Sequence, residues 1–390
     1  MKKLKILAAT FLATLLIAGC SQQELINPDN ETTPELKSAT VSGKYIVVLK
    51  DDADLVNYNF QSRNFRIKET AVGLLKKYEI ASGVEEIYET ALQGFTVKMA
   101  PGQAKKLGAD SSVKFVEADQ VISLSPVVVS GRSGSAPQPI QQTPWGVTRV
   151  GGPGDGTGKT AWVIDTGIDP THPDLNVDKV RSATFLGGKS TPWDENGHGT
   201  HVAGTIAAID NEIGVVGVAA GATVVSVRVL NRQGSGTNSG VIAGVNYVAA
   251  SGQRGDVANM SLGGGVSQAL DDAVLNASGK VDFALAAGNE SDNANNHSPA
   301  RINGAHIYTV SAMWESGAWA SFSNYGNPPV DYCAPGVYIY STYKGGGYET
   351  LHGTSMATPH VTGLLLLGKI HTDGYVTGDP DGNADPIAHR

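Results

Sequence analysis

Three short segments of the sequence each place a reactive side chain among glycines and other small residues. Asp165 ends an apolar run in VIDTGI, His198 lies in NGHGTHVAG, and Ser355 lies in GTSMATPH before an apolar helical pattern. A serine hydroxyl is a poor nucleophile at neutral pH, so it needs a base to take its proton. An imidazole supplies that base, and a carboxylate fixes its tautomer and stabilises the imidazolium. The three side chains together predict nucleophilic acyl transfer.

The order of these residues along the chain supports this interpretation. Aspartate, then histidine, then serine is one of the few orders in which such triads occur. Taken alone, Asp165 has a simpler explanation, because an aspartate at the end of a strand often caps a helix or a turn. We predict Ser355 as the nucleophile, His198 as the general base and then acid, and Asp165 as the group that orients His198.

The same three motifs resemble those of the subtilisin-like serine proteases, and the last third of the chain is most similar to the proteinase K branch. Further matches are PWG at 144–146, SFSNYG at 321–326 and APG at 334–336. The resemblance covers roughly residues 144–370. It implies a subtilisin-like three-layer α/β domain with a mainly parallel sheet, which we assign to 144–390. It also implies a serine endopeptidase that works through an acyl-enzyme.

The resemblance further implies an oxyanion hole and a substrate groove. Asn289, in AAGNE, would donate its side-chain amide to the developing oxyanion, with the backbone N–H of Ser355 as the second donor. The segment NMSLGG at 259–264 matches the edge strand that pairs with an extended peptide, and such main-chain pairing gives broad sequence preference. The predicted substrate-binding residues are Ser261, Leu262, Gly263, Ala286, Ala287 and Gly288.

The walls of this predicted pocket are small or apolar, so we expect cleavage after apolar or aromatic residues. Glu290 at the rim would also admit lysine or arginine. Two other functions stay open at this point. A catalytically dead relative would act as a binding module, although no triad or oxyanion residue is missing. A dedicated processing enzyme with one physiological partner would carry the same motifs, because specificity depends on pocket walls and loops.

The family resemblance also implies a structural calcium site, while catalysis requires no cofactor. The segment IDNEIGV at 209–215 resembles the family's calcium loop, and hard cations prefer several oxygen ligands. The predicted ligands are Asp174, Gln141, Asn211 and the carbonyl groups of Ile209, Ile213 and Val215. The alternative is an empty polar loop. A second acidic stretch, 379–383, lacks the terminal acidic ligand of an EF-hand, and we interpret it as an exposed turn.

His201 lies three residues after His198, so the two might be taken for metal ligands. No acidic third ligand follows in a zinc pattern, and we therefore interpret His201 as structural. His172 and His360 are likewise interpreted as packing or hydrogen-bonding groups. Cys333 lies in a strand-like run, where a buried and unreactive thiol is expected.

Short apolar runs alternate with helical patterns through the second half of the chain. This alternation predicts a parallel sheet that helices cover on both faces. The predicted strands include 161–164, 224–227, 282–286 and 307–310, and the predicted helices include 198–209 and 238–251.

Residues 43–124 form a separate module whose element order, β-α-β-β-α-β, favours a small α+β ferredoxin-like fold. The predicted elements are strand 45–49, helix 66–80, two strands within 84–98, helix 101–108 and strand 115–124. The family resemblance implies that this module is an inhibitory prodomain, and the alternative is a spacer domain. We expect its last strand to enter the substrate groove and to pair with the edge at 261–263.

Residues 125–143 are rich in Ser, Gly, Pro and Gln, which predicts a linker that is open to proteolysis. We expect the chain to be made as an inactive zymogen and to mature by cleavage between Leu124 and about Gln141. The bond Leu124–Ser125 is the best candidate, because leucine suits an apolar pocket. Bonds next to the linker prolines are poorer, since proline on the leaving side lacks an N–H.

The N-terminus predicts a lipoprotein signal peptide at 1–19. Lysines precede an apolar stretch that is too short for a comfortable membrane span and that ends in IAGC. This end resembles a bacterial lipobox, so Cys20 would be lipidated and 20–42 would be a flexible tether. The alternative is a plain signal peptide that contains a cysteine.

Ser21, the residue after the predicted lipidation site, favours outer-membrane sorting in a Gram-negative host. We therefore expect a lipoprotein of the bacterial cell envelope, anchored to the membrane by lipid. Cleavage in the linker would release the mature domain unless the two parts stay bound.

The composition is that of a globular protein, with 41% hydrophobic and 17% charged residues among 390. A net charge of -8 without a long basic run argues against nucleic-acid binding. Two cysteines far apart in the sequence do not make a disulfide framework. We expect a monomer whose partners are protein or peptide substrates and its own prodomain.

Overall fold

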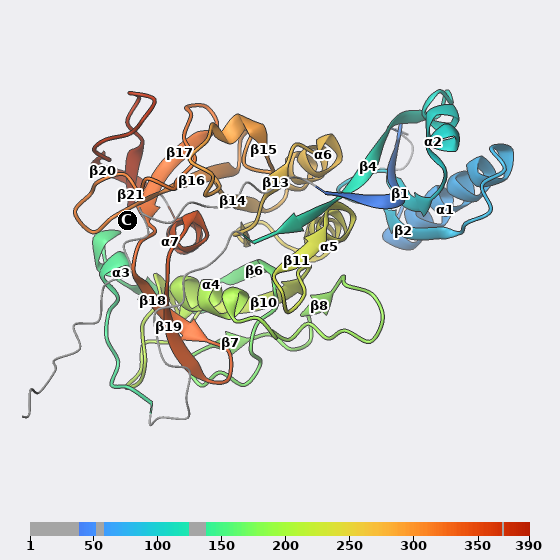
Figure 1. Cartoon of the computed structure of the whole chain (residues 1–390). Helices are drawn as coiled ribbons and strands as arrows, with labels where there is room; N and C mark the ends of the chain where they lie inside the picture. The colour runs from blue at the N-terminus through green and yellow to red at the C-terminus, as the bar shows by residue number, and fades with distance from the viewer. Residues whose placement is uncertain (1–38, 52–57, 125–137, 369) are drawn as a thin grey trace, which may run out of the picture.

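The computed structural model describes residues 39–51, 58–124, 138–368 and 370–390. The predicted signal peptide, the lipidation site Cys20 and almost all of the tether therefore lie outside the described residues, as does most of the linker. Within the described part of the chain, no helix is long and apolar enough to cross a membrane. Two domains lie side by side, and a long strand of the smaller one reaches across to the larger (Figure 1).

The smaller domain has the predicted element order. Its elements are β1 (Thr40–Leu49), α1 (Phe60–Lys77), β2 (Val84–Tyr88), β3 (Gly94–Lys98), α2 (Pro101–Gly108) and β4 (Val113–Ser123). The strands pair antiparallel in the order β4-β1-β3-β2, and both helices pack on one face of this sheet. Apolar residues at helical spacing on α1, among them Ile67, Ala71 and Leu74, are buried against Val47 and Phe95 of the sheet.

The larger domain is built on a twisted sheet whose order is β20-β21-β17-β16-β14-β12-β6-β10-β7. Its strands are β6 (Thr160–Asp165), β7 (Asn176–Val177), β10 (Thr223–Arg228), β12 (Val257–Met260), β14 (Asp282–Ala286), β16 (Ile307–Met313), β17 (Val330–Pro335), β20 (His371–Tyr375) and β21 (Pro386–His389). All neighbouring strands from β7 to β21 pair in parallel, and β20 joins the edge antiparallel. The expectation of a mainly parallel sheet is confirmed.

Helices cover both faces of this sheet, as the apolar runs predict. The helices are α3 (Trp145–Arg149), α4 (His198–Ala207), α5 (Asn238–Ser251), α6 (Gln268–Ala277) and α7 (Thr354–Leu367). Trp162 and Ile164 of β6 share an apolar cluster with α5 and α6, whereas Ala161 and Val163 of the same strand share another with α4 and α7. Successive side chains of a strand point to opposite faces, so a strand buried on both faces is apolar throughout.

Short elements complete the larger domain. They are β5 (Gly154–Asp155), β8 (Ala183–Thr184), β9 (Ala219–Ala220), β11 (Ser235–Thr237), β13 (Gly264–Gly265), β15 (His297–Ser298), the hairpin β18 (Ile339–Tyr343) and β19 (Gly347–Leu351), and a 3₁₀ turn at Ala294–Asn296. The hairpin packs on α4, and β11 lies at the start of α5, next to β4 of the smaller domain (Figure 1). The two predicted helices 101–108 and 238–251 have the predicted bounds.

Candidate active site

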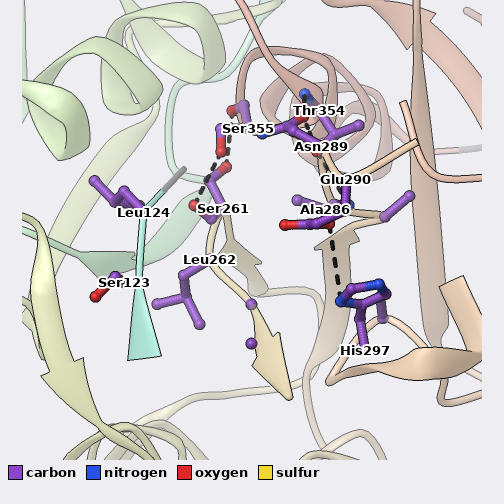
Figure 2. A pocket seen from close by; sticks show the side chains of 15 residues that line it. Ser123, Leu124, Ser261, Leu262, Ala286, Asn289, Glu290, His297, Thr354 and Ser355 are labelled. Carbon is purple, nitrogen blue, oxygen red and sulfur yellow. Dashed lines mark hydrogen bonds and ion pairs between the residues drawn. The ribbon is translucent and has the colours of Figure 1, made fainter. Parts of the chain in front are cut away.

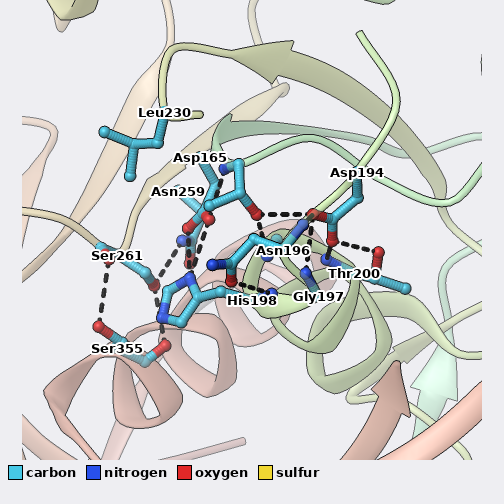
Figure 3. Close-up of polar contacts among 12 residues, drawn as sticks. Asp165, Asp194, Asn196, Gly197, His198, Thr200, Leu230, Asn259, Ser261 and Ser355 are labelled. Atoms are coloured by element: carbon cyan, nitrogen blue, oxygen red, sulfur yellow. Dashed lines mark hydrogen bonds and ion pairs between the residues drawn. The ribbon is translucent and has the colours of Figure 1, made fainter. Parts of the chain in front are cut away.

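Asp165 and His198 come together where β6 ends and α4 begins. His198 is the first residue of α4, and its Nδ1 lies 2.8 Å from Oδ1 and 3.0 Å from Oδ2 of Asp165 (Figure 3). Both residues are buried, with relative exposures of 1% and 0%. The backbone N–H of Thr166 also donates to Oδ1 of Asp165, at 2.6 Å. A carboxylate held in this way fixes the proton on Nδ1 and leaves Nε2 as a base.

Asp194, which the sequence reasoning did not identify, organises the start of α4. Its Oδ1 accepts the backbone N–H groups of Asn196 and Gly197, both at 2.9 Å. Its Oδ2 accepts the N–H of Thr200 at 3.0 Å and the hydroxyl of Thr200 at 2.6 Å. These are the orphan donors of a helix start, and a carboxylate there is also favoured by the helix dipole. Asp194 is therefore a positioning residue for His198.

Glycines allow α4 to lie this close to the end of β6. Gly197 has φ 118°, which favours glycine, and a β-carbon there would overlap the ring of Tyr343. A β-carbon on Gly199 would overlap the carbonyl oxygen of Gly167. The glycines that surround His198 in the sequence are thus needed for the contact between His198 and Asp165.

Ser355 is the second residue of α7, and it faces Ser261. Its Oγ donates to the carbonyl oxygen of Ser261 at 3.1 Å, and Oγ of Ser261 donates to the carbonyl of Ser355 at 2.8 Å. Among the described residues Nε2 of His198 has no hydrogen-bond partner. In Figure 3 the Nε2 edge of the ring lies on the side of Ser261 and Ser355, away from Asp165. The hydroxyl of Ser355 thus hydrogen-bonds to the backbone of Ser261, and it must rotate to reach Nε2 of His198.

Asn289 is anchored through its carbonyl end. The N–H of Thr354 donates to Oδ1 of Asn289 at 2.8 Å, and the Thr354 hydroxyl does so at 3.0 Å. The amide nitrogen of Asn289 is therefore the end that is left to face the groove. Both predicted oxyanion donors, this amide and the N–H of Ser355, meet at the start of α7, where the helix dipole also favours negative charge.

A pocket beside Ser355 contains every residue predicted to bind substrate (Figure 2). It is lined by Ser261, Leu262, Gly263, Gly264, Ala286, Ala287, Gly288, Asn289, Glu290, His297, Ala300, Thr354 and Ser355, and by Ser123 and Leu124 of the smaller domain. In the larger domain, the proposed catalytic residues and the pocket residues come from six separate segments of the sequence, namely 165, 198, 261–264, 286–290, 297–300 and 354–355.

Comparison with known proteins assigns both domains. The subtilase family matches residues 156–373, and the peptidase inhibitor I9 family matches residues 44–125. The chain belongs to the subtilase family. It is a subtilisin-like serine protease with an I9 inhibitor prodomain, which implies that it is made as a zymogen.

This subtilase is similar in sequence to serine proteases of bacteria and fungi over most of its length. It is 40% identical over 339 residues to alkaline serine exoprotease A of Vibrio alginolyticus, a match covering 84% of this chain and 60% of that protein. It is 36% identical over 367 residues to the subtilisin-like serine protease AsES of Sarocladium strictum, covering 83% of this chain and 89% of that protein. The crystal structure of a cold adapted subtilisin-like serine proteinase aligns with a TM-score of 0.57 at 40% identity, over 63% of this chain and 97% of that one.

The prodomain of this subtilase inserts its last strand into the groove, but on the side opposite to the predicted one. β4 pairs antiparallel with β11, in the register Ser123↔Ser235, and the N–H of Leu124 continues the ladder to the carbonyl of Gly234 at 2.8 Å. The prediction that this strand pairs with 261–263 was wrong. The neighbouring strand β13 pairs instead with β15, whereas the edge of β11 is open to β4.

Two prodomain carboxylates lie at the starts of catalytic-domain helices. Asp119 accepts the N–H of Ser239 at 3.0 Å and its hydroxyl at 2.6 Å, at the start of α5. Glu117 accepts the hydroxyl of Ser267 and the N–H of Ala269, at the start of α6. Both carboxylates accept hydrogen bonds from donors at helix N-termini. The helix dipole also favours negative charge at these positions.

The prodomain also contacts the side of α5 through a buried polar group, the side chain of Asn246. Oδ1 of Asn246 on α5 accepts the backbone N–H groups of residues 89, 90 and 91, and its Nδ2 donates to Glu89 at 2.9 Å. Apolar residues of the prodomain, among them Leu92 and Ile122, belong to the same cluster as the inner faces of α5 and α6. Burial raises the pKa of Glu89 and of Glu117.

The residues of the predicted calcium site lie together around Asp174. Oδ1 of this fully buried carboxylate accepts from Asn211 Nδ2 at 2.9 Å, and Oδ2 accepts the N–H of Val215 at 3.0 Å. Oε1 of Gln141 accepts the N–H of Asn211. Burial raises the pKa of Asp174 to about 6. Among the described residues no group of three or more His, Cys, Asp or Glu could hold a metal, so the site would combine one carboxylate with amides and carbonyls.

The other histidines singled out in the sequence have structural partners. Nε2 of the buried His201 donates to the carbonyl of Ile339 at 3.0 Å, and burial lowers its pKa to about 3. His172 donates to the carbonyl of Gly347 and His360 to that of Met356, both at 2.9 Å. Cys333 is fully buried in β17. These contacts fit the structural interpretation of the three histidines.

Proposed function

We propose that Asp165, His198, Ser355 and Asn289 are the catalytic residues of this serine endopeptidase. The observation that supports this most strongly is the buried contact of 2.8 Å between His198 and Asp165, with the His198 ring next to Ser355 in Figure 3 and Asn289 in the same pocket as Ser355. The matching experiment is Asp165→Asn, which keeps the shape but favours the wrong tautomer of His198. We expect kcat to fall by about 10⁴ with unchanged circular dichroism. A loss below about tenfold would contradict the assignment.

The mechanism follows from this arrangement. Oγ of Ser355 attacks the carbonyl carbon of the scissile bond while Nε2 of His198 takes its proton. Asp165 stabilises the imidazolium, and the amide of Asn289 with the N–H of Ser355 stabilises the oxyanion. His198 then gives the proton to the leaving amine, which frees the new N-terminus and leaves the acyl-enzyme. Water, deprotonated by His198, attacks the ester and releases the acid product and the serine.

The pocket supports broad specificity, with apolar or aromatic residues preferred before the cut. Its walls at Ala286, Ala287 and Gly288 are small, and Leu262 supplies an apolar surface. An extended substrate would bind mainly through its backbone, as β4 does on β11. Profiling with a peptide library tests this, and a profile dominated by acidic residues before the cut would overturn it.

The prodomain is proposed to inhibit the enzyme until the chain is cut between Leu124 and about Gln141, with Leu124–Ser125 as the favoured bond. The support is that β4 ends in the groove and that Leu124 lines the pocket beside Ser355. Residues 43–124, expressed alone and added to mature enzyme, should inhibit tightly and slowly. Absence of inhibition at high micromolar concentration, with no change in chain length on activation, would favour a mere spacer domain.

We propose that calcium binds at Asp174, Asn211 and Gln141 with carbonyls of the 209–215 loop. The fit rests on the buried carboxylate and on the oxygen-rich loop around it. Calcium there would stabilise the fold and take no part in the chemistry. A ligand that binds only the native state adds about 2.7 kcal/mol to the free energy of unfolding at a hundredfold excess over Kd. Coincident melting curves with calcium and with chelator would argue against the site.

We further propose that this subtilase belongs to the proteinase K branch, and that it is an envelope lipoprotein anchored through Cys20. The support is the sequence resemblance, namely SFSNYG and GTSMATPH for the branch and IAGC for the lipid anchor. Labelling of cells with a radioactive fatty acid tests the anchor. The precursor should be labelled, and the Cys20→Ala chain should not; equal labelling of both would overturn the proposal.

A further inference from the structure

The wall of the substrate pocket that lies across from Leu124 carries a titratable cluster. Nε2 of His297 lies 3.2 Å from Oδ2 of Asp292, and Nδ1 lies 3.8 Å from Oε2 of Glu290. Both His297 and Glu290 line the pocket (Figure 2). Their side chains are 17% and 26% exposed, so they are mostly withdrawn from water but still reach the cavity. Charge–charge interactions at such a site are stronger than on an open surface.

This cluster is held in place by residues outside it. Nδ2 of the buried Asn324 donates to Oε2 of Glu290 at 2.7 Å, and Oδ1 of Asn324 accepts the N–H groups of Glu290 and Asp292. His297 belongs to β15, which pairs with β13 in the register Gly265↔His297. The geometry of the three side chains is therefore fixed by the fold.

The neighbouring elements add little charge toward His297. β13 consists of Gly264 and Gly265, and the Arg301 guanidinium lies 3.5 Å from Asp271. The prodomain carboxylate Glu117, near Asp271, is bound at the start of α6 and leaves with the prodomain. The carboxylates next to the imidazole are thus Glu290, which lines the pocket, and Asp292, which is not one of the pocket's lining residues.

We propose that His297 is a specificity-determining residue that makes the preference for a cationic side chain before the cut depend on pH. This inference rests on the proposed specificity of the pocket and deepens it. When His297 is neutral, the carboxylate of Glu290 attracts the ammonium of a substrate lysine. When His297 is protonated, its positive charge beside Glu290 weakens that attraction, while an apolar side chain is little affected. Histidine is the side chain whose ordinary charge change falls between pH 5 and 8.

The test compares two peptides that differ only in the residue before the cut, lysine or norleucine. The measured quantity is the ratio of their kcat/KM values from pH 5.5 to 8.5, with active enzyme matured from the full chain. Any effect of pH on the catalytic step that the two peptides share cancels in the ratio. We expect the lysine-to-norleucine ratio to rise about three- to tenfold across this range.

Two substitutions bracket the expected limits of this ratio. In His297→Asn, which cannot be protonated, the ratio should be flat and near the high-pH value of the wild type. In His297→Lys, which is always charged, it should be flat and near the low-pH value. Glu290→Gln should lower the ratio at pH 8.5.

Three results would overturn the inference. They are a flat wild-type ratio, an unchanged pH dependence in His297→Asn, and equal ratios in the two variants. These results leave the protease assignment intact, because both peptides are still cleaved. If neither peptide is cleaved, the proposed function itself fails and the inference falls with it.

Discussion

The free N–H groups at the start of α4 and those at the starts of α5 and α6 are bonded by residues from different parts of the molecule. At α4 the free N–H groups are bonded by Asp194, which belongs to the same domain. At α5 and α6 the helices have their own caps, Thr237 and Ser267, but additional bonds come from Asp119 and Glu117 of the prodomain. The helix that carries His198 is therefore capped without the prodomain, whereas the starts of α5 and α6 also bind prodomain residues.

This difference separates catalysis from inhibition. Removal of the prodomain should leave the contacts around His198 and Asp165 unchanged, because the partners that the structure describes for these two residues belong to the larger domain. It exposes the N-termini of α5 and α6 and the polar surface around Asn246. Substitutions in the first region should change the rate of chemistry, and substitutions in the second should change the affinity for the prodomain.

The largest expected effect lies in the catalytic region. Ser355→Ala removes the nucleophile, and in triads of this kind the loss in kcat is on the order of 10⁶. The variant chain should also remain uncut, with its prodomain attached, as judged by mass spectrometry. Comparable peptidase activity in the variant would contradict both the role of Ser355 and the proposed mode of maturation.

A smaller loss is expected at the oxyanion hole. Asn289→Ala removes one of two donors and should lower kcat by about 10²–10³. KM should change little, because the donor acts mainly on the transition state. Asn289 also accepts two bonds from Thr354, so Thr354→Val is the matched control for disturbed local structure. An equal loss in the control would show that Asn289 acts through the fold of α7.

The next prediction concerns the prodomain carboxylates. An isolated prodomain with Glu117→Ala and Asp119→Ala should inhibit mature enzyme roughly ten- to a hundredfold more weakly, since helix caps each contribute about 0.5–2 kcal/mol. Lys114→Ala is the control, because the pair Lys114–Asp272 is half exposed and such pairs contribute little. Equal effects of the double variant and the control would show that the helix starts are not the centre of the interface.

The smallest predicted effect is a pH dependence of inhibition. Burial in the complex raises the pKa of Glu89 and of Glu117. In the free prodomain these glutamates should lose their protons near the ordinary glutamate pKa of about 4.3, whereas in the complex they keep them to higher pH. Inhibition should therefore be tightest below that pH and should weaken as pH rises through the raised pKa values. Inhibition constants at pH 5 and 7 should differ by less than tenfold in this direction. A prodomain with Glu117→Gln should show a smaller difference, and a reversed trend would contradict the account.

The sequence predicts local and motif-bearing features of this subtilase well. The apolar runs locate the buried strands because a strand covered on both faces is apolar throughout, and helices 101–108 and 238–251 follow from spacing and end signals. The structure brings Asp165 and His198 together, with Ser355 next to the His198 ring in Figure 3 and Asn289 in the same pocket as Ser355.

Contacts between distant segments could not be predicted in the same way. The bonds from Asp119 to Ser239 and from Glu117 to Ser267 span 120 and 150 residues, and no local pattern marks them. Asp194 was missed although it lies four residues before His198, because an acidic residue ahead of a helix is common. The pairing of β4 with β11 was missed because the edge at 261–263 carried the more familiar motif.

The most direct test of the central claim is chemical labelling of the nucleophile. Purified active enzyme is treated with a serine-directed phosphonate, and the modified residue is identified by peptide mapping. If Ser355 is the nucleophile and His198 its base, the enzyme should be completely inactivated with one label on Ser355, and the His198→Ala variant should carry no label. A label on another serine, or full peptidase activity in protein labelled at Ser355, would contradict the account.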